Sequence, residues 1–514
     1  MTGSPDPTDI ERFRGQIARH LGLNFDDTRV GFLAETFRAR VDATELGKES
    51  YLARLGAPQT NPREWRVLAD ELTVPETYFF RNSDQLRALK DVALPDRLRA
   101  RAAHRTLRIF SAGCASGEEA YSLAIIVREA LTAASGFRFA ISAVDVSPRI
   151  LERARQGLYS SWALRETPVE VKQKWFRASG RNFALDDEIV HTVTFTELNL
   201  IADDDACWKP DSFDIIFCRN VMMYFTPEHA RGLVGRLERA LTPGGFLFLG
   251  HAETLRGLSQ NFHLRHTNGT FYYQRRDSTA ETAQSLKWGL AVSAPAVSVP
   301  LTTIVDNASS WVDAIRQASE RIQALSEPSP APGSVSAEVD PHDSTSLAQH
   351  VGKAVDLLRR ERFGEALAVI TGVPSAWSKD PEVLLLRAVL LTHSGDLVRA
   401  QETCVELLAV DELNAGAHYL AALCREAAKD RQGAVEHDQA AAYLDAGFAM
   451  PRLHLGLLAR RAGQAAKARN ELSQALVLLQ CEDSSRLLLF GGGFSREALV
   501  TLCRAELAVV GESS

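Results

Sequence analysis

The spacing of apolar residues divides the chain into three regions with different predicted structures. Residues 10–95 carry apolar side chains at helical spacing, for example Phe32, Leu33 and Phe37, which predicts a bundle of helices. Between residues 107 and 273, short apolar runs alternate with helical patterns. From about residue 347 onward, small residues recur at a fixed interval. The pattern predicts a fold of the α/β plus all-α class.

The middle region reads as a parallel sheet whose strands are connected by helices. The apolar runs predict strands at residues 107–110, 139–144, 192–195, 213–218 and 246–250, and a hairpin at 263–273. Ser147 and Thr226, each followed by proline, predict helix starts, and the Pro-Gly-Gly at 243–245 predicts a helix end. Such alternation predicts a doubly wound sheet with its ligand at the carboxyl ends of the strands. The alternation lapses between residues 159 and 192, which predicts a small inserted subdomain.

The C-terminal region has a period of 34 residues. Two series of small residues share this period: Ala354, Ala388, Ala422 and Gly456, and Ala366, Ala400, Ala434 and Ala468. Gly395 and Gly463 lie two periods apart. A 34-residue period with small residues where two helices cross is typical of tetratricopeptide (TPR) repeats, which bind other proteins on a concave face.

Composition excludes several classes of protein. A net charge of −7 argues against a general nucleic-acid binder, which needs a basic surface. The chain has no apolar run of about 18 residues and no signal-peptide pattern, so we expect a cytoplasmic protein without membrane insertion. Its 7 cysteines are scattered and include no C-x-x-C, which predicts reduced thiols and no metal site.

The strongest candidate for chemistry is the segment LRIFSAGCASGEEAYS at residues 107–122. Gly113 and Gly117 follow a predicted strand and allow a close approach of the backbone to a ligand. Asp145, at the end of the next strand, is placed to accept hydrogen bonds from a ribose. Flavin, NAD and S-adenosyl-L-methionine (SAM) folds all use a glycine loop and an acid. Glu118 and Glu119 open the following helix and would repel a pyrophosphate, which favours SAM.

Four segments together resemble the CheR-type chemotaxis-receptor methyltransferases. They are TVPETYFFRN at 73–82, SAGCASGEEAYS at 111–122, FDIIFCRNVMMYF at 213–225 and FLFLGHAETL at 246–255. The resemblance covers residues 10–275. It implies transfer of a methyl group from SAM to glutamate side chains on the cytoplasmic helices of chemoreceptors, in chemotaxis or related chemosensory signalling. The 34-residue repeats resemble those of a subset of the family that carries a C-terminal TPR domain.

The resemblance also implies roles for individual residues. Arg81 and Tyr224 match the two side chains near the transferring methyl group and are the catalytic candidates. Glu119 matches the residue that holds the methionine end of the cofactor, and Asp145 matches the residue on the ribose. The complete predicted cofactor set is Thr77, Arg81, Gly113, Glu119, Asp145, Asn199, Leu200, Asn220 and Val221.

Three features depart from the family pattern. Pro75 stands where the family commonly has asparagine, which removes a polar contact to the cofactor. The basic docking helix is thinner, because Glu35 lies among Arg29, Arg38 and Arg40. The inserted segment around residues 177–190 is short, so we expect recruitment of an unknown protein partner through the repeats rather than through a receptor's C-terminal peptide.

Other functions compete with this interpretation. A nucleic-acid N-methyltransferase would carry an N/D-P-P-Y/F loop, which residues 220–224 match only loosely and without the prolines. A small-molecule methyltransferase would usually lack both the N-terminal bundle and the repeats. The remaining alternative is a TPR scaffold that binds SAM without catalysing transfer.

These observations predict three domains and a linker. They are an N-terminal helical docking domain at 8–95, a methyltransferase domain at 96–276 with an inserted subdomain at about 159–192, a Ser/Pro/Ala-rich linker at 277–345, and a TPR domain at 346–512.

Overall fold

The computed structural model describes residues 6–57, 61–73, 76–131, 136–202, 207–277, 344–360 and 362–512. The chain divides into two compact units, residues 1–279 and 280–514. Pro75 and nearly all of the predicted linker lie outside the described residues. No helix of the described part of the chain is long and apolar enough to span a membrane.

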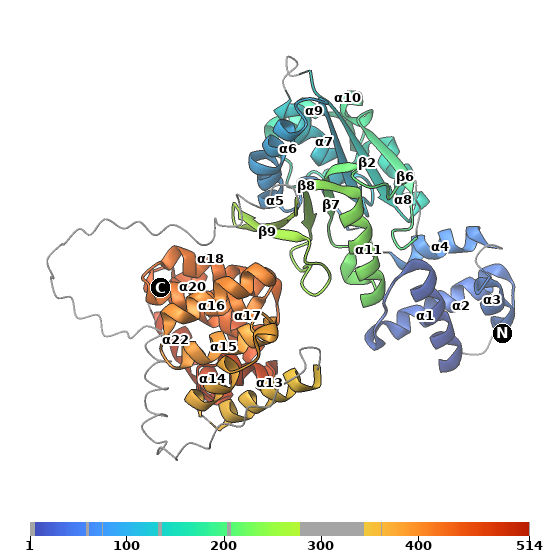
Figure 1. Ribbon diagram of the computed structural model, residues 1–514. Coiled ribbons are helices and arrows are strands. Elements are labelled where there is room, and N and C mark those ends of the chain that lie inside the picture. Colours follow the sequence, from blue (N-terminus) through green and yellow to red (C-terminus); the bar gives the residue numbers. More distant parts are fainter. Residues whose placement is uncertain are drawn as a thin grey trace. The chain divides into compact units, whose positions relative to one another are not determined.

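The first unit begins with a helical bundle, as predicted (Figure 1). Its elements are α1(Pro7–Leu21), η1(Asp27–Arg29), α2(Val30–Thr44), α3(Lys48–Leu55) and α4(Pro62–Leu72). Asp6 caps α1 by accepting a hydrogen bond from the Thr8 N–H, and Gly22 ends the helix in a left-handed conformation. The bundle has its own core, in which the rings of Phe13, Phe37 and Tyr51 contact one another. These contacts bury one face of each helix.

The next helices belong to a second core. α5(Ser83–Ala88) continues through a π-helical turn, η3(Leu89–Ala93), into α6(Leu94–Ala100). Phe79, Leu86 and Leu94 pack with the residues of the sheet, not with the bundle. The apolar spacing predicts residues up to 95 as part of the bundle, but α5 and α6 cover the sheet. Helical periodicity identifies a helix but does not say which core its apolar face joins.

The second core surrounds a seven-stranded sheet with the order β6-β2-β1-β7-β8-β10-β9. The strands are β1(Thr106–Ala112), β2(Arg138–Asp145), β6(Val193–Glu197), β7(Phe213–Cys218), β8(Leu241–Leu249), β9(Phe262–Thr267) and β10(Thr270–Arg275). The first five are parallel, which confirms the predicted doubly wound arrangement. β9 and β10 form the predicted antiparallel hairpin at the edge of the sheet. The strand order reverses between β1 and β7, so a ligand site is expected there.

One predicted boundary was wrong. α11(Pro227–Ala240) ends before the Pro-Gly-Gly sequence, and β8 already begins at Leu241. The register between β7 and β8 shifts at this point: Leu241 pairs with Phe213, whereas Phe246 pairs with Ile215. The Pro-Gly-Gly therefore forms an irregularity inside the strand, which accommodates a residue without an N–H and a left-handed glycine.

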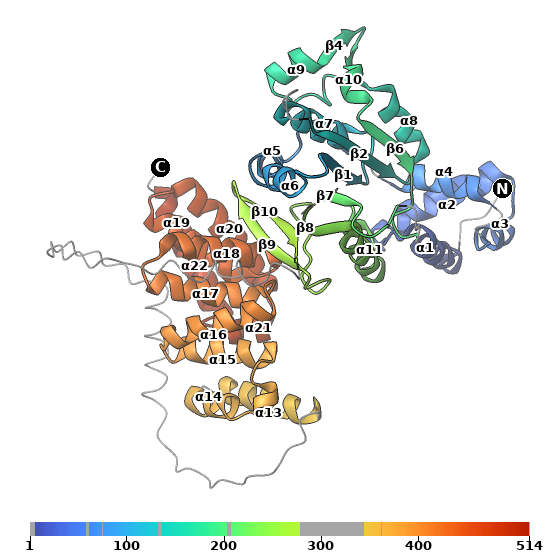
Figure 2. The ribbon, with the colours of Figure 1, turned by 45° about the horizontal axis from the view of Figure 1, so that its top comes forward.

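The other helix signals around the sheet are confirmed. α7(Glu118–Ala130) follows the glycine loop, and α8(Pro148–Gln156) begins after Ser147, whose side chain accepts from the Ile150 N–H. Gly157 ends α8 in a left-handed conformation. α4 of the bundle packs against α8, and Figure 2 shows the bundle beside α8 and α11.

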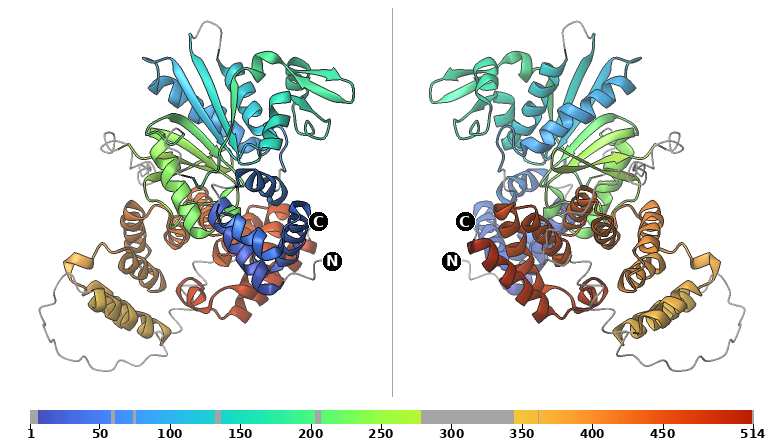
Figure 3. Two further views of the ribbon diagram at one scale, coloured as in Figure 1. Left: turned by 90° about the vertical axis from the view of Figure 1, so that its right-hand side faces the viewer. Right: turned by 90° about the vertical axis from the view of Figure 1, so that its left-hand side faces the viewer.

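The predicted inserted subdomain contains a small antiparallel sheet with the order β3-β5-β4. Its elements are β3(Leu158–Tyr159), α9(Val169–Trp175), β4(Phe176–Ser179), β5(Asn182–Leu185) and α10(Asp187–Val190). This subdomain projects from the main sheet (Figure 3). Its inner residues, including Tyr159 and Phe176, join the core of the sheet, which fixes the subdomain in place.

The second unit is an array of helix pairs with the predicted period. Its elements are α13(Ser344–Arg359), α14(Phe363–Thr371), η6(Ser375–Trp377), α15(Pro381–His393), α16(Leu397–Val410), α17(Ala415–Ala427), α18(Arg431–Leu444), α19(Ala449–Arg461), α20(Ala465–Cys481), α21(Ser484–Phe490) and α22(Arg496–Glu512). The first helices of three pairs start at residues 381, 415 and 449, and the second helices of four pairs start at 363, 397, 431 and 465. The start positions are therefore 34 residues apart in both series.

The two series of small residues lie where the helices cross. Ala388, Ala422 and Ala434 are fully buried, and a Cβ atom on Gly456 would lie 2.6 Å from Leu472 Cγ. Larger side chains at these positions would separate the paired helices. The period in the sequence is thus the period of helix contact.

A segment of the chain itself covers part of the first helices of the array. Phe490 of α21 lies 6.0 Å from the ring of Tyr419 and 5.1 Å from the ring of Phe448. A Cβ on Gly416 would lie 2.7 Å from the Phe490 ring, so the small residue makes room for it. α21 therefore occupies surface that a bare repeat array would expose.

The repeat geometry predicts that Lys429→Gly stabilises the array. Gly395, Lys429 and Gly463 occupy equivalent positions after the first helices, and all three are left-handed, with φ of 77°, 64° and 71°. Lys429 is exposed and has a Cβ that this conformation disfavours. We expect a gain of between about 0.5 and 1 kcal/mol in the free energy of unfolding, after subtraction of the entropy that glycine adds to the unfolded chain. Urea unfolding of the full chain measures this gain. Lys429→Ala retains the Cβ, and an equal gain in that variant would contradict the explanation.

Candidate functional site

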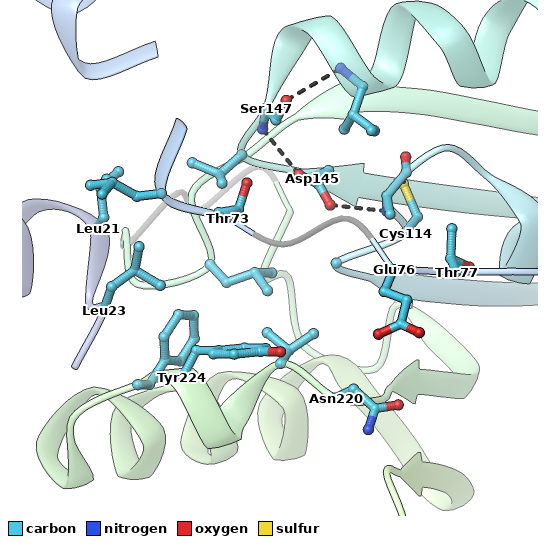
Figure 4. Close-up of a pocket in the computed structure, with 18 of the residues that line it drawn as sticks. Leu21, Leu23, Thr73, Glu76, Thr77, Cys114, Asp145, Ser147, Asn220 and Tyr224 are labelled. Carbon is cyan, nitrogen blue, oxygen red and sulfur yellow. Dashed lines mark hydrogen bonds between the residues drawn. The ribbon is translucent and has the colours of Figure 1, made fainter. Parts of the chain in front are cut away.

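The predicted site residues line a single pocket in the first unit. The pocket lies at the carboxyl ends of β1, β2, β6 and β7, where the strand order reverses. All ten predicted residues line it: Thr77, Arg81, Gly113, Glu119, Asp145, Asn199, Leu200, Asn220, Val221 and Tyr224. Figure 4 shows Asp145 and Ser147 across the pocket from Tyr224 and Asn220. The helical bundle closes one side through Leu21, Leu23 and Thr73.

The glycine loop after β1 forms the floor of the pocket. The N–H groups of Gly113 and Cys114 donate to the Val144 carbonyl at 2.8 and 2.9 Å, which joins this loop to the end of β2. Gly113 has a φ of 71°, and a Cβ there would lie 2.5 Å from Val221 Cγ2. Only glycine fits between the two loops.

Gly113→Ala is therefore expected to weaken cofactor binding by at least about tenfold, because both the left-handed backbone and the contact with Val221 would be strained. Calorimetric titration with the cofactor measures the change. Gly180→Ala is a matched control, because Gly180 is also left-handed but a Cβ there would meet no atom within 4 Å, and it lies in the inserted subdomain. The double variant Gly113→Ala/Val221→Ala removes the contact and should recover part of the affinity. No recovery would assign the loss to the backbone alone.

Asp145 ends β2 and is held by backbone donors. Its Oδ2 accepts from the Ala115 N–H at 2.9 Å, and its Oδ1 accepts from the Ser147 N–H at 3.0 Å. Burial raises the pKa of Asp145, and these backbone hydrogen bonds act in the opposite direction. Each carboxylate oxygen retains a further lone pair, so the group is fixed in orientation and able to accept from a ligand.

Glu119 is paired inside the pocket wall. Its Oε1 accepts from Ser111 Oγ at 2.7 Å, and its Oε2 accepts from Arg219 Nε at 2.7 Å. Arg219 is buried and donates as well to the Arg81 carbonyl. Glu118, by contrast, is buried against Ser116 and is not part of the pocket lining. Of the two glutamates that would repel a pyrophosphate, only Glu119 therefore lines the pocket.

Asn199 joins the sheet to the bundle. Its Nδ2 donates to the His20 carbonyl at 2.6 Å, and its Oδ1 accepts from the Ile201 N–H at 3.2 Å. A second link is formed by Ser147 Oγ, which donates to Asp70 of α4. The position of the bundle wall therefore depends on residues that also line the pocket.

The loop after β7 is organised by Glu253. Its buried carboxylate accepts from the N–H groups of Gly250 and Asn220 at 2.7 Å, Val221 at 2.8 Å and Met223 at 3.2 Å. Asn220 is left-handed, with a φ of 58°, which asparagine tolerates better than most residues. One carboxylate thus shapes the loop that carries Asn220, Val221 and Tyr224.

Arg81 lies in a strained segment. Phe80 and Asn82, on either side of it, are both left-handed with φ of 59°. Such a backbone is uncommon for a bulky residue, and here the Phe80 N–H is held by Ser122 Oγ at 3.0 Å. Arg81 Nη1 donates to the Glu76 carbonyl at 2.8 Å. This hydrogen bond holds the Arg81 side chain at the edge of the pocket.

Tyr224 enters the pocket from η5(Met222–Tyr224). The Asn24 N–H donates to its carbonyl at 2.7 Å, and the side chain packs against the core of the bundle. Figure 4 shows its ring facing the pocket. The tyrosine is therefore placed by both cores of the unit.

Two important residues are absent from the predicted set. Arg219 and Glu253 lie in the motifs at 213–225 and 246–255, and their role is to hold other site residues. A motif alone does not distinguish residues that hold the site from residues that contact a ligand. The arginines of the predicted basic docking helix also differ in their surroundings. Arg40 forms a bidentate ion pair with Glu64, with both distances at 2.8 Å, whereas Arg38 is exposed and Arg29 lines the pocket.

Comparisons with known proteins identify the family of this part of the chain. Residues 75–271 match the family model described as CheR methyltransferase, SAM binding domain. Chemotaxis protein methyltransferase 2 of Vibrio cholerae serotype O1 is 34% identical over 274 residues, which are 52% of this chain and 93% of that protein. A probable chemotaxis protein methyltransferase of Rhizobium etli is 36% identical over 242 residues, 46% of this chain and 88% of that protein.

A third relative is longer than the first two. The probable biofilm formation methyltransferase WspC of Pseudomonas aeruginosa is 30% identical over 244 residues, 47% of this chain and 56% of that protein. Because the residues that match the family model, 75–271, lie within residues 1–279, the family assignment applies to the first unit of this chain. The chain belongs to the CheR family of chemotaxis methyltransferases and is a methyltransferase that uses SAM.

Proposed function

We propose that this enzyme methylates glutamate side chains on the cytoplasmic signalling helices of chemoreceptors and forms glutamate methyl esters. The observation that carries the proposal is the convergence of all ten predicted residues on one pocket at the switch point of the sheet. The names of the relatives, chemotaxis protein methyltransferases, support the receptor as substrate.

The side chains around the pocket suit a cofactor that is rich in donors and positively charged. Asp145, Glu119, Asp70 and Glu76 place carboxylates along the lining. Carboxylates accept from hydroxyl and ammonium groups and attract a cationic sulfur. We assign Asp145 to the ribose, Glu119 to the methionine end, and Asn199 with Leu200 to the adenine. Thr77, Gly113, Asn220 and Val221 complete this cofactor set.

When bound, SAM supplies a methyl group on a cationic sulfur, which a carboxylate oxygen takes by direct displacement while the sulfur keeps the electron pair of the broken bond. A glutamate is already ionised at neutral pH, so the protein needs no general base. Its task is to position the carboxylate in line at about 3 Å from the methyl carbon.

Arg81 and Tyr224 are the residues that we propose to carry out this positioning. Arg81 has free N–H donors that can orient the incoming carboxylate as a fork. Tyr224 presents its ring and hydroxyl to the pocket. We further propose that the enzyme acts in the cytoplasm and that the repeat array recruits a protein partner to the site of methylation.

Labelling of receptors tests this function. The purified full chain and its Arg81→Ala and Tyr224→Phe variants are incubated with methyl-labelled SAM and with membranes that carry chemoreceptors from the same cell. We expect base-labile label on a receptor, reduced about 100-fold in Arg81→Ala at saturating SAM. Tyr224→Phe separates the hydroxyl from the ring. SAM binding without label on any receptor would overturn the proposal in favour of a non-catalytic scaffold.

A further inference from the structure

Two arginines and two aromatic rings form a continuous stack that leads from the pocket to the surface. The Arg81 guanidinium carbon lies 5.7 Å from the centre of the Tyr78 ring. The Arg165 guanidinium carbon lies 3.7 Å from the same ring and 4.3 Å from the ring of Trp162. We call Arg81, Tyr78, Arg165 and Trp162 the arginine–aromatic stack. It starts at a pocket residue and ends on the inserted subdomain.

The outer end of the stack is fixed although it is exposed. The Phe79 N–H donates to the Ala163 carbonyl at 2.9 Å, which ties the turn that carries Trp162 and Arg165 to the pocket segment. Arg165 Nη1 donates to the Trp162 carbonyl at 2.9 Å. Trp162 nevertheless has 72% of its surface exposed. A large apolar ring held rigidly in solvent is a typical anchor for a protein partner.

The arginines of the stack keep their charge available. The pocket-wall arginine Arg219 is neutralised by Glu119, and Arg40 of the bundle is neutralised by Glu64. In the described part of the chain, no ion pair includes Arg81 or Arg165. Stacking on a ring holds a guanidinium without neutralising it and leaves its N–H edge free for a carboxylate. The stack therefore presents two positive charges on a chain whose net charge is −7.

We propose that the arginine–aromatic stack docks the substrate helix, and that the preferred helix is acidic and amphipathic. This inference rests on the proposed function. Both guanidinium carbons lie over the Tyr78 ring, so their separation is less than two helical turns, or about 11 Å. A helix that presents its reactive glutamate to Arg81 therefore places a second carboxylate, about one turn away, at Arg165. An apolar side chain on the same face packs on Trp162.

Methylation kinetics of a receptor fragment test the docking role. The substrate is the purified cytoplasmic signalling fragment of a chemoreceptor from the same cell. For Arg165→Glu and Trp162→Ala, we expect the KM for the fragment to rise at least tenfold, while kcat and the affinity for SAM stay within twofold. The KM of the wild type should rise with salt concentration. The KM of Arg165→Ala should rise less, because the attraction that salt screens has been removed.

The matched control is Arg181→Glu, which reverses the charge of an exposed arginine in the same subdomain. We expect it to retain the wild-type KM. If Arg165→Glu and Trp162→Ala both retain the wild-type KM, the docking proposal is overturned. Methylation of the fragment by the wild type would still support the proposed function.

Direct binding separates docking from chemistry. Fluorescence anisotropy of the labelled receptor fragment with the full chain measures affinity without any transfer. Binding that weakens in Trp162→Ala supports the docking proposal even where the wild type leaves the fragment unmethylated, a result that would contradict the proposed function alone. A wild-type chain that neither binds nor methylates the fragment would overturn both.

Discussion

Glu253→Gln is expected to destabilise the first unit by about 3 kcal/mol and to abolish measurable cofactor binding. Four backbone N–H groups, from Gly250, Asn220, Val221 and Met223, donate to the two oxygens of this carboxylate. Glutamine retains only one acceptor oxygen. Its amide group would direct its own N–H donors at backbone donors 2.7 Å away, in a site where the side chain is 4% exposed.

The loop that Glu253 holds carries three proposed site residues, so loss of its shape should affect binding before the fold is lost. Urea unfolding followed by circular dichroism measures stability, and calorimetry measures SAM affinity. Glu118→Gln is the matched control, because Glu118 is equally buried but its pKa is raised by burial and its side chain accepts from Ser116 Oγ. A neutral side chain is tolerated better there. Equal losses in the two variants would show that burial of the group, and not the four donors, decides the result.

The stability of the repeat array should fall by about 3 kcal/mol between pH 6.5 and 9. His454 is fully buried, with Nε2 2.9 Å from Glu426 and Nδ1 2.7 Å from Asp438. Burial lowers the pKa of His454, but the two carboxylates outweigh it and raise the value to about 9. A histidine whose folded pKa exceeds its unfolded value of about 6.5 stabilises the fold fully below pH 6.5 and loses that contribution as the pH rises through 9.

The neighbouring carboxylates do not add to the slope above pH 7. Burial raises the pKa of Asp438 to about 6, whereas His454 and Arg461 outweigh burial at Glu426 and lower its pKa to about 2. Both groups are therefore ionised above pH 7, in the folded and the unfolded chain alike. Thermal unfolding followed at several pH values measures the slope.

His454→Gln should remove most of that slope. His393→Asn should retain it, because burial lowers the pKa of His393 to about 4 and leaves it neutral throughout the window. A wild-type slope in His454→Gln would exclude His454 as the origin.

The sequence predicted the strands and the pocket better than the partition of the helices. Alternating apolar runs locate the five parallel strands because such strands are buried on both faces. Parallel strands bring their carboxyl ends to one edge of the sheet, and the residues that follow these strands line one pocket there. The assignment of α5 and α6 required knowledge of which core lies beside them, and periodicity carries no such information.

The sequence also could not predict the roles of residues that act by holding other residues in place. Glu253 lies about 30 positions after the loop that it organises, and only the pairing of β7 with β8 brings them together. Arg40 has the spacing of a docking residue, but its partner Glu64 lies on another helix. Long-range pairing of charges decides both roles, and a local pattern cannot reveal it.

The N-terminal bundle forms one wall of the pocket, so a molecule bound there would bridge two hydrophobic cores. Leu21 belongs to the core of the bundle and Thr73 follows its helix α4, whereas Asp145 ends β2 and Asn220 follows β7. A molecule that touches both cores contributes to their cohesion, and its affinity depends in turn on how they are held together. Residues 75–271, the part that the family model covers, lack this wall, so that fragment alone encloses only part of the pocket. Occupancy of this pocket and attachment of the bundle are therefore expected to be thermodynamically linked.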